Sequence, residues 1–401
     1  MFKLPLIPLT ELLAKGLSFI IIIILTRVLS IEEYGLFNYI VSLVMLLSVL
    51  MDGGINNYIF NKSVKNELNE INDYFNSRIV LSFFIICILL LFVFIYEKEY
   101  FIYILLYSSF VFFNSTLSFF KMLARGREYK KIDIQTIILD PFFRLLILSI
   151  LFLLEIKLSL VEVLEVFIGV EIFIFLIIYI SIKQYFKIYF SFDNIIFKLK
   201  TIILDSKYFL LYYLFFVAIQ RIDVLFINNN IGNEGVALFS SAFNLYMVVL
   251  LFFSSYLTSG FKSISENREN FIRYVKNIVF FYLFIITVIF IFSEFIYTML
   301  YPAEYKGANN YLILLMFSLP FTIISYFGIY YFNYIHKTYF NVMLLAVFFI
   351  VKFFFLFLMN LKYIEQYIYM LMIIEIVLGI TYLFLLVKNM KGVFSENITN
   401  K

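Results

Sequence analysis

The sequence predicts an all-α polytopic membrane protein with twelve transmembrane helices. The chain of 401 residues is 64% hydrophobic and 14% charged, and its mean hydropathy is +0.98. Soluble domains are about 45–50% apolar and about 25% charged, so lipid surrounds most of this chain. Two further observations are the alternation of long apolar runs with short polar breaks and the gathering of Lys and Arg in every other break. These features exclude a soluble enzyme, a secreted disulfide scaffold and a nucleic-acid binder.

Each apolar run is long enough to cross the hydrocarbon core, which takes about 20 helical residues. A helix closes its own backbone hydrogen bonds, as the bilayer requires. A β-barrel would need short segments of alternating polarity, and runs such as 18–25 and 79–95 do not alternate. In chain order the predicted spans are 7–29, 35–59, 78–96, 100–123, 132–154, 160–182, 203–228, 235–260, 274–300, 308–334, 338–360 and 364–387.

The distribution of Lys and Arg predicts the orientation. With the N-terminus in the cytoplasm, 22 of the 31 basic residues fall in cytoplasmic segments, 4 fall outside and 5 fall within spans. Cytoplasmic loops of membrane proteins carry such an excess of positive charge. The sequence therefore predicts an even number of spans, with both termini in the cytoplasm.

The chain is expected to form two six-helix bundles. We predict an N-terminal bundle over residues 1–185, a cytoplasmic linker over 186–202 and a C-terminal bundle over 203–401. The linker mixes aromatic and charged residues, which is typical of an amphipathic helix in the headgroup plane or of a plain connection.

A weak internal repeat supports this division. Residues 25–43 align with 227–245 at an offset of 202 residues, and Glu32 then matches Glu234. Both segments run from the end of one predicted span, through a tight break, into the next. Because six spans separate the copies, the repeat is parallel, with its axis along the membrane normal.

Three segments resemble one known family. They are residues 13–60, residues 221–245, with an Ile-Asp pair at Ile222 and Asp223, and residues 301–315. The motifs are moderately specific one by one and strong in combination. Together they resemble the Wzx-type polysaccharide flippases of the multidrug/oligosaccharidyl-lipid/polysaccharide exporter (MOP) superfamily. In the first segment the motif residues are Thr26, Arg27, Leu29, Glu32, Glu33, Tyr34 and Gly35.

The resemblance implies a fold and a function. It implies a MATE-like fold, with two six-helix bundles that face a central cavity. It also implies a flippase that moves undecaprenyl-pyrophosphate-linked oligosaccharide repeat units, as for O-antigen (lipopolysaccharide) or capsule, to the outer leaflet of the inner membrane. The expected partners are this substrate, membrane lipids, and the polymerase and glycosyltransferases of the same pathway. The two additional helices of the lipid II flippase branch do not follow the twelfth span, which disfavours a peptidoglycan-precursor role.

Five basic residues lie within predicted spans, where a charge costs about 2.5–3.5 kcal/mol. A pyrophosphate-linked sugar is anionic, so fixed cations in a cavity would offset its lost hydration through charge-assisted hydrogen bonds. The candidate substrate-binding cations are Arg221, Lys352, Arg144, Lys15 and Arg27.

Each candidate cation has a structural alternative. Lys15 is four residues after Glu11, an ion-pair spacing, or it lines a cavity entrance. Arg27 extends to the outer interface, caps the cavity roof, or pairs with Glu32 or Glu33. Arg144 and Asp140 have the same spacing on either side of a proline, so they form a buried pair or contact substrate.

Arg221 and Lys352 lack an acid at pairing distance on their own helices, and they are the strongest candidates. The acids Asp223, Asp52 and Glu171 are candidates for ion coupling, either to a proton or to Na⁺.

Two other functions remain open from the sequence. A cation-coupled drug or metabolite antiporter on the same fold would have an acid-dominated cavity, and a polysaccharide polymerase or membrane glycosyltransferase would need a long outward loop. One His and one Cys cannot build a His/Cys metal cluster. We therefore expect a transporter, not an enzyme, with no catalytic residue, cofactor or metal.

Overall fold

The computed structural model describes residues 6–65, 71–189, 195–266 and 268–399. These residues form two compact units, Met1–Arg221 and Ile222–Lys401. The division falls inside one continuous helix, α8 (Ile195–Asn230). The last eight residues of the predicted linker are therefore helical, and residues 190–194 lie outside the described part of the chain.

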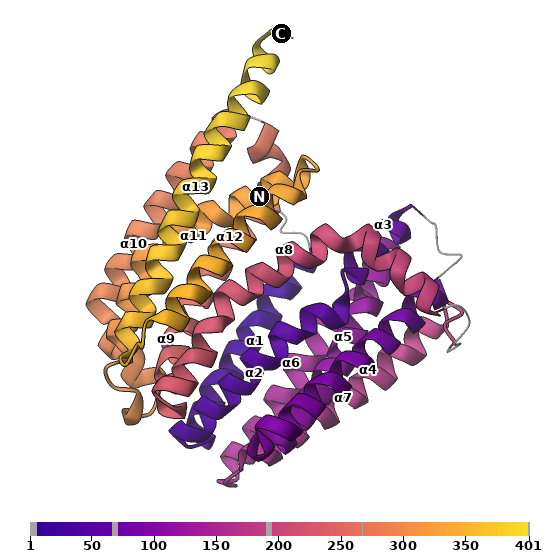
Figure 1. Ribbon diagram of the computed structural model, residues 1–401, viewed down its shortest axis with the longest axis vertical. Coiled ribbons are helices and arrows are strands. Elements are labelled where there is room, and N and C mark those ends of the chain that lie inside the picture. Colours follow the sequence, from indigo (N-terminus) through magenta and orange to yellow (C-terminus); the bar gives the residue numbers. More distant parts are fainter. Residues whose placement is uncertain (1–5, 66–70, 190–194, 267, 400–401) are drawn as a thin grey trace. The chain divides into compact units, whose positions relative to one another are not determined.

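Helices account for nearly all of the first unit (Figure 1). In chain order they are α1 (Leu6–Val28), α2 (Ile31–Asp52), α3 (Ile55–Val64), α4 (Ile71–Tyr96), the 3₁₀ turn η1 (Lys98–Tyr100), α5 (Phe101–Gly126), α6 (Lys130–Leu153), α7 (Leu160–Lys183) and the first part of α8.

The second unit continues from α8 in the same all-helical manner. Its elements are α9 (Asn233–Glu266), α10 (Arg268–Leu300), the 3₁₀ turn η2 (Ala303–Tyr305), α11 (Ala308–Tyr334), α12 (Thr338–Leu358) and α13 (Ile364–Thr399).

The predicted all-α fold class is confirmed. Twelve helices of the described ranges are long and apolar enough to cross a membrane, and they match the predicted spans in order. Within those ranges no residue is assigned to a strand. Hydropathy locates these helices because a segment that crosses the hydrocarbon core must be apolar and must form all of its own backbone hydrogen bonds.

The second predicted span was wrong, because the structure divides it into two helices. Residues 35–59 were expected as one helix, but α2 ends at Asp52 and α3 begins at Ile55. The break is formed by Gly53 and Gly54, whose φ angles of 57° and 76° are left-handed. A left-handed residue stops an α-helix, and glycine adopts this conformation without steric cost.

Helices α2 and α7 begin with the same N-terminal capping motif. Ser30 accepts a hydrogen bond from the N–H of Glu33 at 3.2 Å, and Glu33 accepts one from the N–H of Ser30. Ser159 and Glu162 form the same capping box at α7. Glu33 also accepts a hydrogen bond from the N–H of Leu160 at 3.3 Å, which joins the two helix starts.

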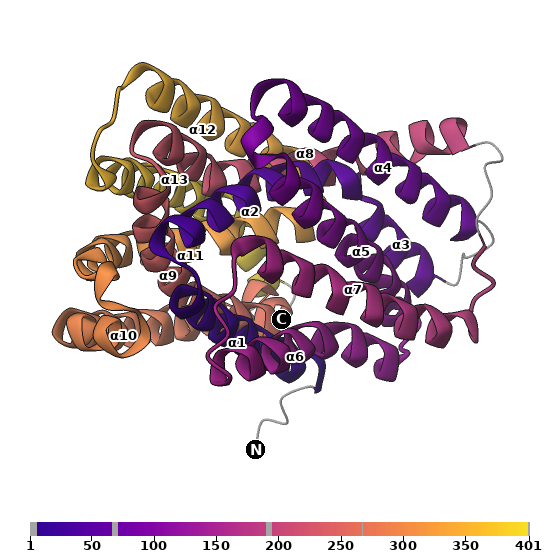
Figure 2. The same ribbon diagram turned by 90° about the horizontal axis from the view of Figure 1, so that it is seen from below.

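Aromatic packing forms the centre of the first unit. α1 packs on α6, and α5 packs on α7 and α3, an arrangement that Figure 2 shows from below. Phe75 of α4 packs against both Phe119 and Phe120 of α5, with a distance of 5.7 Å between ring centroids in each case. All three rings are at most 5% exposed. This core keeps α5 in a defined position, and α5 carries several of the site residues described below.

In the second unit α11 is the central helix. It packs against α9, α10, α12 and α13. Gly379 allows α13 to approach closely, because a Cβ there would lie 2.6 Å from the carbonyl oxygen of Phe321. Because four helices surround α11, Thr322 in the middle of this helix is buried although it is polar.

We predict that Gly54→Ala destabilises the first unit. The alanine would be strained at φ 76°, and its Cβ would lie 2.7 Å from the Cβ of Ser206 on α8. Strain of this kind costs on the order of 1–3 kcal/mol, so the melting temperature of the purified protein should fall by several degrees.

Gly169→Ala is the matched control for this prediction. Gly169 lies within helix α7, and a Cβ there meets nothing within 4 Å. Alanine is favoured over glycine in a helix by up to about 1 kcal/mol, so this variant should melt at or above the wild-type temperature. Equal melting of both variants would contradict the assigned role of Gly54.

Candidate functional site

A polar cavity of about 340 Å³ lies in the first unit, between α1, α5 and α6, and we call it the first-unit pocket. Charged and hydrogen-bonding side chains dominate its walls although all three helices are candidate spans. Its lining residues are Glu11, Ala14, Lys15, Ser18, Asn114, Leu117, Ser118, Lys121, Thr136, Ile137, Asp140 and Pro141.

Two lysines give the first-unit pocket its cationic character. Lys15 projects from α1 and Lys121 from α5. Neither ammonium group forms an ion pair within the described part of the chain. Both are therefore placed to receive an anionic group that enters the pocket.

Lys121 was missed as a site residue by the sequence reasoning. It was counted among the basic residues of a cytoplasmic segment, although it lies two residues before the end of the predicted span 100–123. In the structure α5 continues to Gly126, so Lys121 stands on the last turns of a membrane helix. The available signal was its spacing of seven residues from Asn114, which places both on one helix face.

An ion-pair bridge ties the three helices together beside the pocket. Arg125 of α5 donates to Glu11 of α1 at 2.8 Å and to Asp133 of α6 at 2.9 Å. The alternative in which Glu11 pairs with Lys15 was therefore wrong: Glu11 is bound to Arg125. The bidentate geometry of a guanidinium suits such a bridge better than a lysine does.

The predicted pairing of Asp140 with Arg144 is confirmed. Both residues lie on α6, one turn apart, and Pro141 lies inside the continuous helix. The guanidinium of Arg144 also stacks over Phe110 and Phe167, at 5.1 and 4.8 Å from their ring centroids. Asp140 is thus shared between the pocket wall and this buried ion pair.

Glu171 of α7 lies directly behind the pocket and is fully buried. Its Oε1 accepts a hydrogen bond from Nδ2 of Asn114 at 2.8 Å. Asn114 itself lines the pocket. The structure therefore brings Lys15, Arg144 and Glu171, three of the predicted residues, into one neighbourhood.

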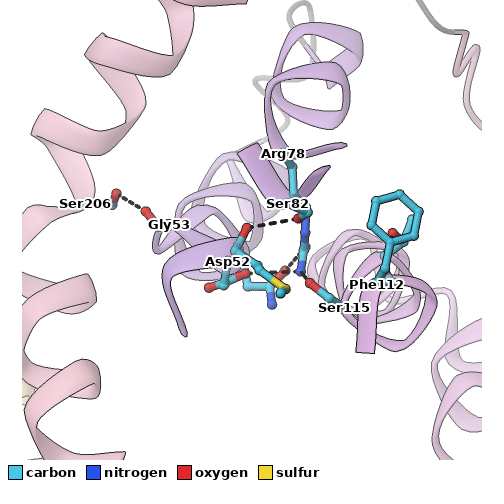
Figure 3. A network of polar contacts seen from close by, with 10 residues as sticks. Asp52, Gly53, Arg78, Ser82, Phe112, Ser115 and Ser206 are labelled. Carbon is cyan, nitrogen blue, oxygen red and sulfur yellow. Dashed lines mark hydrogen bonds and ion pairs between the residues drawn. The ribbon is translucent and has the colours of Figure 1, made fainter. Parts of the chain in front are cut away.

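A second polar cluster surrounds Asp52 at the break between α2 and α3 (Figure 3). Arg78 of α4 lies 3.2 Å from the carboxylate of Asp52 and donates to Asn56 at 2.5 Å and to Ser115 at 2.6 Å. Ser206 of α8 donates to the carbonyl oxygen of Gly53 at 2.6 Å. The first stretch of α8 is thereby attached to the break.

Arg78 was also missed, because it was counted with a cytoplasmic segment although it is the first residue of the predicted span 78–96. It is 1% exposed and belongs to a helix that begins at Ile71. Hydropathy does not reveal this, because residues 71–77 are mostly polar. The available signal was Asp52, an acid in a predicted span that had no assigned partner.

In the second unit, Asp223 of α8 and Lys352 of α12 form an ion pair. Both side chains are fully buried. Glu375 of α13 lies nearby, hydrogen-bonded to Thr322, and Thr322 also bonds to the hydroxyl of Tyr246 at 2.7 Å. The sequence required a partner for Asp223 on another helix, and the structure shows that this partner is Lys352. The charge of Lys352 is therefore used in the ion pair with Asp223.

The two remaining predicted cations lie elsewhere. Arg27 is exposed at the end of α1, and Arg221 is half-buried in α8. Arg221 lies within electrostatic range of Tyr107 on α5 and Tyr213 on α8. In the ranges that the structure describes, no group of three or more His, Cys, Asp or Glu side chains is placed to hold a metal ion.

Solved structures of transporters share this fold. An inward-facing multidrug-resistance MATE transporter of the MOP superfamily matches with a TM-score of 0.69 and 14% identity, over 96% of each chain. A MOP-superfamily transporter from Pyrococcus furiosus, described by the reverse polarity of its binding pocket, matches at 0.62 and 13%, over 96% of this chain and 94% of that one. The bent form of the Vibrio cholerae MATE transporter VcmN matches at 0.61 and 13%, over 96% and 95%.

These likenesses define the class as a multi-pass membrane protein with the MATE-like fold. A family model described as polysaccharide biosynthesis protein matches residues 6–261. The chain therefore belongs to the polysaccharide biosynthesis protein family, and the resemblance to polysaccharide flippases of the MOP superfamily is confirmed. No curated protein matches the chain.

We predict that the Asp223–Lys352 pair behaves as a unit. Lys352→Met leaves a buried carboxylate without its cation, a change that costs about 3–5 kcal/mol. Thermal unfolding of the purified protein should show a large loss of stability for Lys352→Met, and adding Asp223→Asn should restore most of it. A double variant no more stable than Lys352→Met would show that the two charges do not depend on each other.

Proposed function

We propose that this protein is a flippase that moves an undecaprenyl-pyrophosphate-linked oligosaccharide from the cytoplasmic to the outer leaflet by alternating access. The observation that carries the proposal is the first-unit pocket, where Lys15 and Lys121 stand on membrane helices without ion-pair partners in the described chain. Membership of the polysaccharide biosynthesis family supports a glycan as the cargo.

The chemistry of the cargo explains why cations at this depth are useful. A pyrophosphate loses strong hydration when it leaves water, and an ammonium group at hydrogen-bond distance replaces part of it. A hydrogen bond to a charged group contributes about 1.5–3 kcal/mol. Two lysines would therefore hold a head group firmly, and the acids Glu11 and Asp140 in the same wall would keep that binding reversible.

The other predicted residues enter the proposal as further contacts. Arg27 and Arg221 would meet the substrate along its path, while Arg144 and Lys352 would act from within their ion pairs. The acids Asp52, Asp223 and Glu171 stay predictions for ion coupling.

The setting of the proposal is a bacterial envelope pathway. The glycan would be a repeat unit of an O-antigen, and so of lipopolysaccharide, or of a capsule. The protein would act in the cell inner membrane. Its partners would be the lipid-linked oligosaccharide, membrane lipids, and the polymerase and glycosyltransferases of the same pathway.

Two alternatives are weaker. A cation-coupled drug or metabolite antiporter would favour an acid-dominated pocket. This pocket presents two lysines, and its two acids, Glu11 and Asp140, are each paired with an arginine. A polysaccharide polymerase would need an outward segment to hold catalytic groups. On the predicted outer side the breaks between helices are at most seven residues long.

The test is deletion of the gene in its host, followed by complementation. We expect the deletion to abolish a surface glycan, and the double variant Lys15→Met, Lys121→Met to fail to restore it. Loss of each lysine should weaken substrate binding by about tenfold to a hundredfold, which follows from the hydrogen-bond energy above. Glycan output is measured on gels of surface polysaccharide, with protein levels checked by immunoblot.

Lys157→Met is the matched control, because it removes the same charge from an exposed position between α6 and α7. It should complement fully. An unchanged glycan profile in the deletion strain would contradict a flippase role in that pathway. Full rescue by the double lysine variant would contradict the assignment of the first-unit pocket.

A further inference from the structure

Two acids meet behind the first-unit pocket. The carboxyl groups of Asp140 on α6 and Glu171 on α7 lie in hydrogen-bonding contact. Asp140 is 8% exposed and Glu171 is fully buried. Helices α6 and α7 pack together, so packing holds the two groups against each other.

The hydrogen bonds around this pair are incomplete in a specific way. Arg144 engages one oxygen of Asp140, and Asn114 donates to Oε1 of Glu171. The remaining oxygens, Oδ1 of Asp140 and Oε2 of Glu171, have no donor among the described residues. These two atoms belong to the two carboxyls that meet.

An ionised carboxylate only accepts hydrogen bonds, whereas a protonated one also donates. Two ionised carboxylates in contact would repel each other and leave Oδ1 of Asp140 and Oε2 of Glu171 without a donor. One proton between them removes the repulsion and provides the missing donor. Carboxyl pairs that share one proton are a known outcome of this geometry.

The charged and titratable groups around the pair come from several helices. α6 supplies Arg144, paired with Asp140, and α5 supplies Asn114, with Tyr107 within electrostatic range of both acids. Tyr107 also lies in range of Arg221 on α8. Of the further helices packed on α6 and α7, α2 brings Glu33 to the start of α7, eleven residues before Glu171, and α1 brings Glu11 and Lys15 to the pocket.

The acid pair is also part of the pocket wall. Asp140 and Asn114 line the same cavity as Lys15 and Lys121. An anion bound to the lysines would therefore face a wall whose charge depends on the shared proton. Binding of the anion and retention of the proton favour each other, and this coupling acts equally in both directions.

We propose that Asp140 and Glu171 hold one proton between them, and that this proton binds cooperatively with a phosphate-bearing anion in the first-unit pocket. The identity of the anion rests on the proposed function, and the shared proton rests on the geometry of α6 and α7. The site thus links the protonation of two membrane-buried acids to substrate occupancy.

The proton itself is tested without any ligand. Infrared spectroscopy of the purified protein in phosphatidylcholine nanodiscs should show the carbonyl band of a protonated carboxylic acid. Glu171→Gln replaces the protonated acid by a neutral group of the same shape, so it should remove this band. Glu165→Gln, an exposed acid on the same helix, should leave the band in place, and a band that persists unchanged in Glu171→Gln would overturn the proposal.

The coupling is tested by calorimetric titration with inorganic pyrophosphate from mildly acidic to mildly alkaline pH. The affinity of the wild type for pyrophosphate should fall as the pH rises, and so should that of Glu165→Gln. This fall should be at least about fivefold larger than the fall measured for Glu171→Gln, because fivefold is the lower end of usual coupling between two sites. Equal pH dependence in all three proteins would overturn the cooperativity. Asp140→Asn serves as the second variant if Glu171→Gln does not fold.

The two tests separate this inference from the proposed function. Absence of pyrophosphate binding at every pH, with the infrared band present and lost in Glu171→Gln, would contradict the anion site and the cooperativity while leaving the shared proton established. If pyrophosphate binds at every pH and no band of a protonated carboxyl group is seen, the proposal of a shared proton is overturned, while the anion site stands.

Discussion

Hydrocarbon does not solvate charge, and the placement of nearly every charged side chain discussed above follows from that constraint. A charge on a membrane helix is stable only if it finds a counter-charge or a polar cavity inside the bundle. Asp52 with Arg78, Asp140 with Arg144, and Asp223 with Lys352 are three solutions of the first kind. The Asp52–Arg78 and Asp223–Lys352 pairs each join different helices. They also fix the rotation of these helices, because turning one helix would separate the charges and expose an unpaired charge to lipid.

The first-unit pocket is the polar cavity that accommodates the other charges. The protein's own acids do not neutralise all of the cations in it. Arg125 uses both of its acids to hold α1, α5 and α6 together, which leaves Lys15 and Lys121 available. The fully buried Asp223–Lys352 pair in the second unit contrasts with this arrangement. The difference explains why the substrate proposal rests on the lysines of the pocket rather than on Lys352.

Prediction from sequence was accurate where one physical quantity dominates. The twelve spans follow from hydropathy, and the Asp140–Arg144 pair follows from helix periodicity. It was inaccurate at helix ends, where polar residues such as Asn72 and Asn76 continue α4 below the apolar run. Arg78 and Lys121 were missed because each lies at the cytoplasmic end of a predicted span and was counted with the neighbouring cytoplasmic segment.

The sequence by itself determined the solvent of this protein, the order of its helices and the residues that carry charge into the membrane, because these depend on composition and local periodicity. Only the tertiary structure decided which charges meet. Asp223 and Lys352 are 129 residues apart, and Asn114 and Glu171 are 57 apart. No local rule relates residues at such separations, because their contact depends on which helix faces pack together.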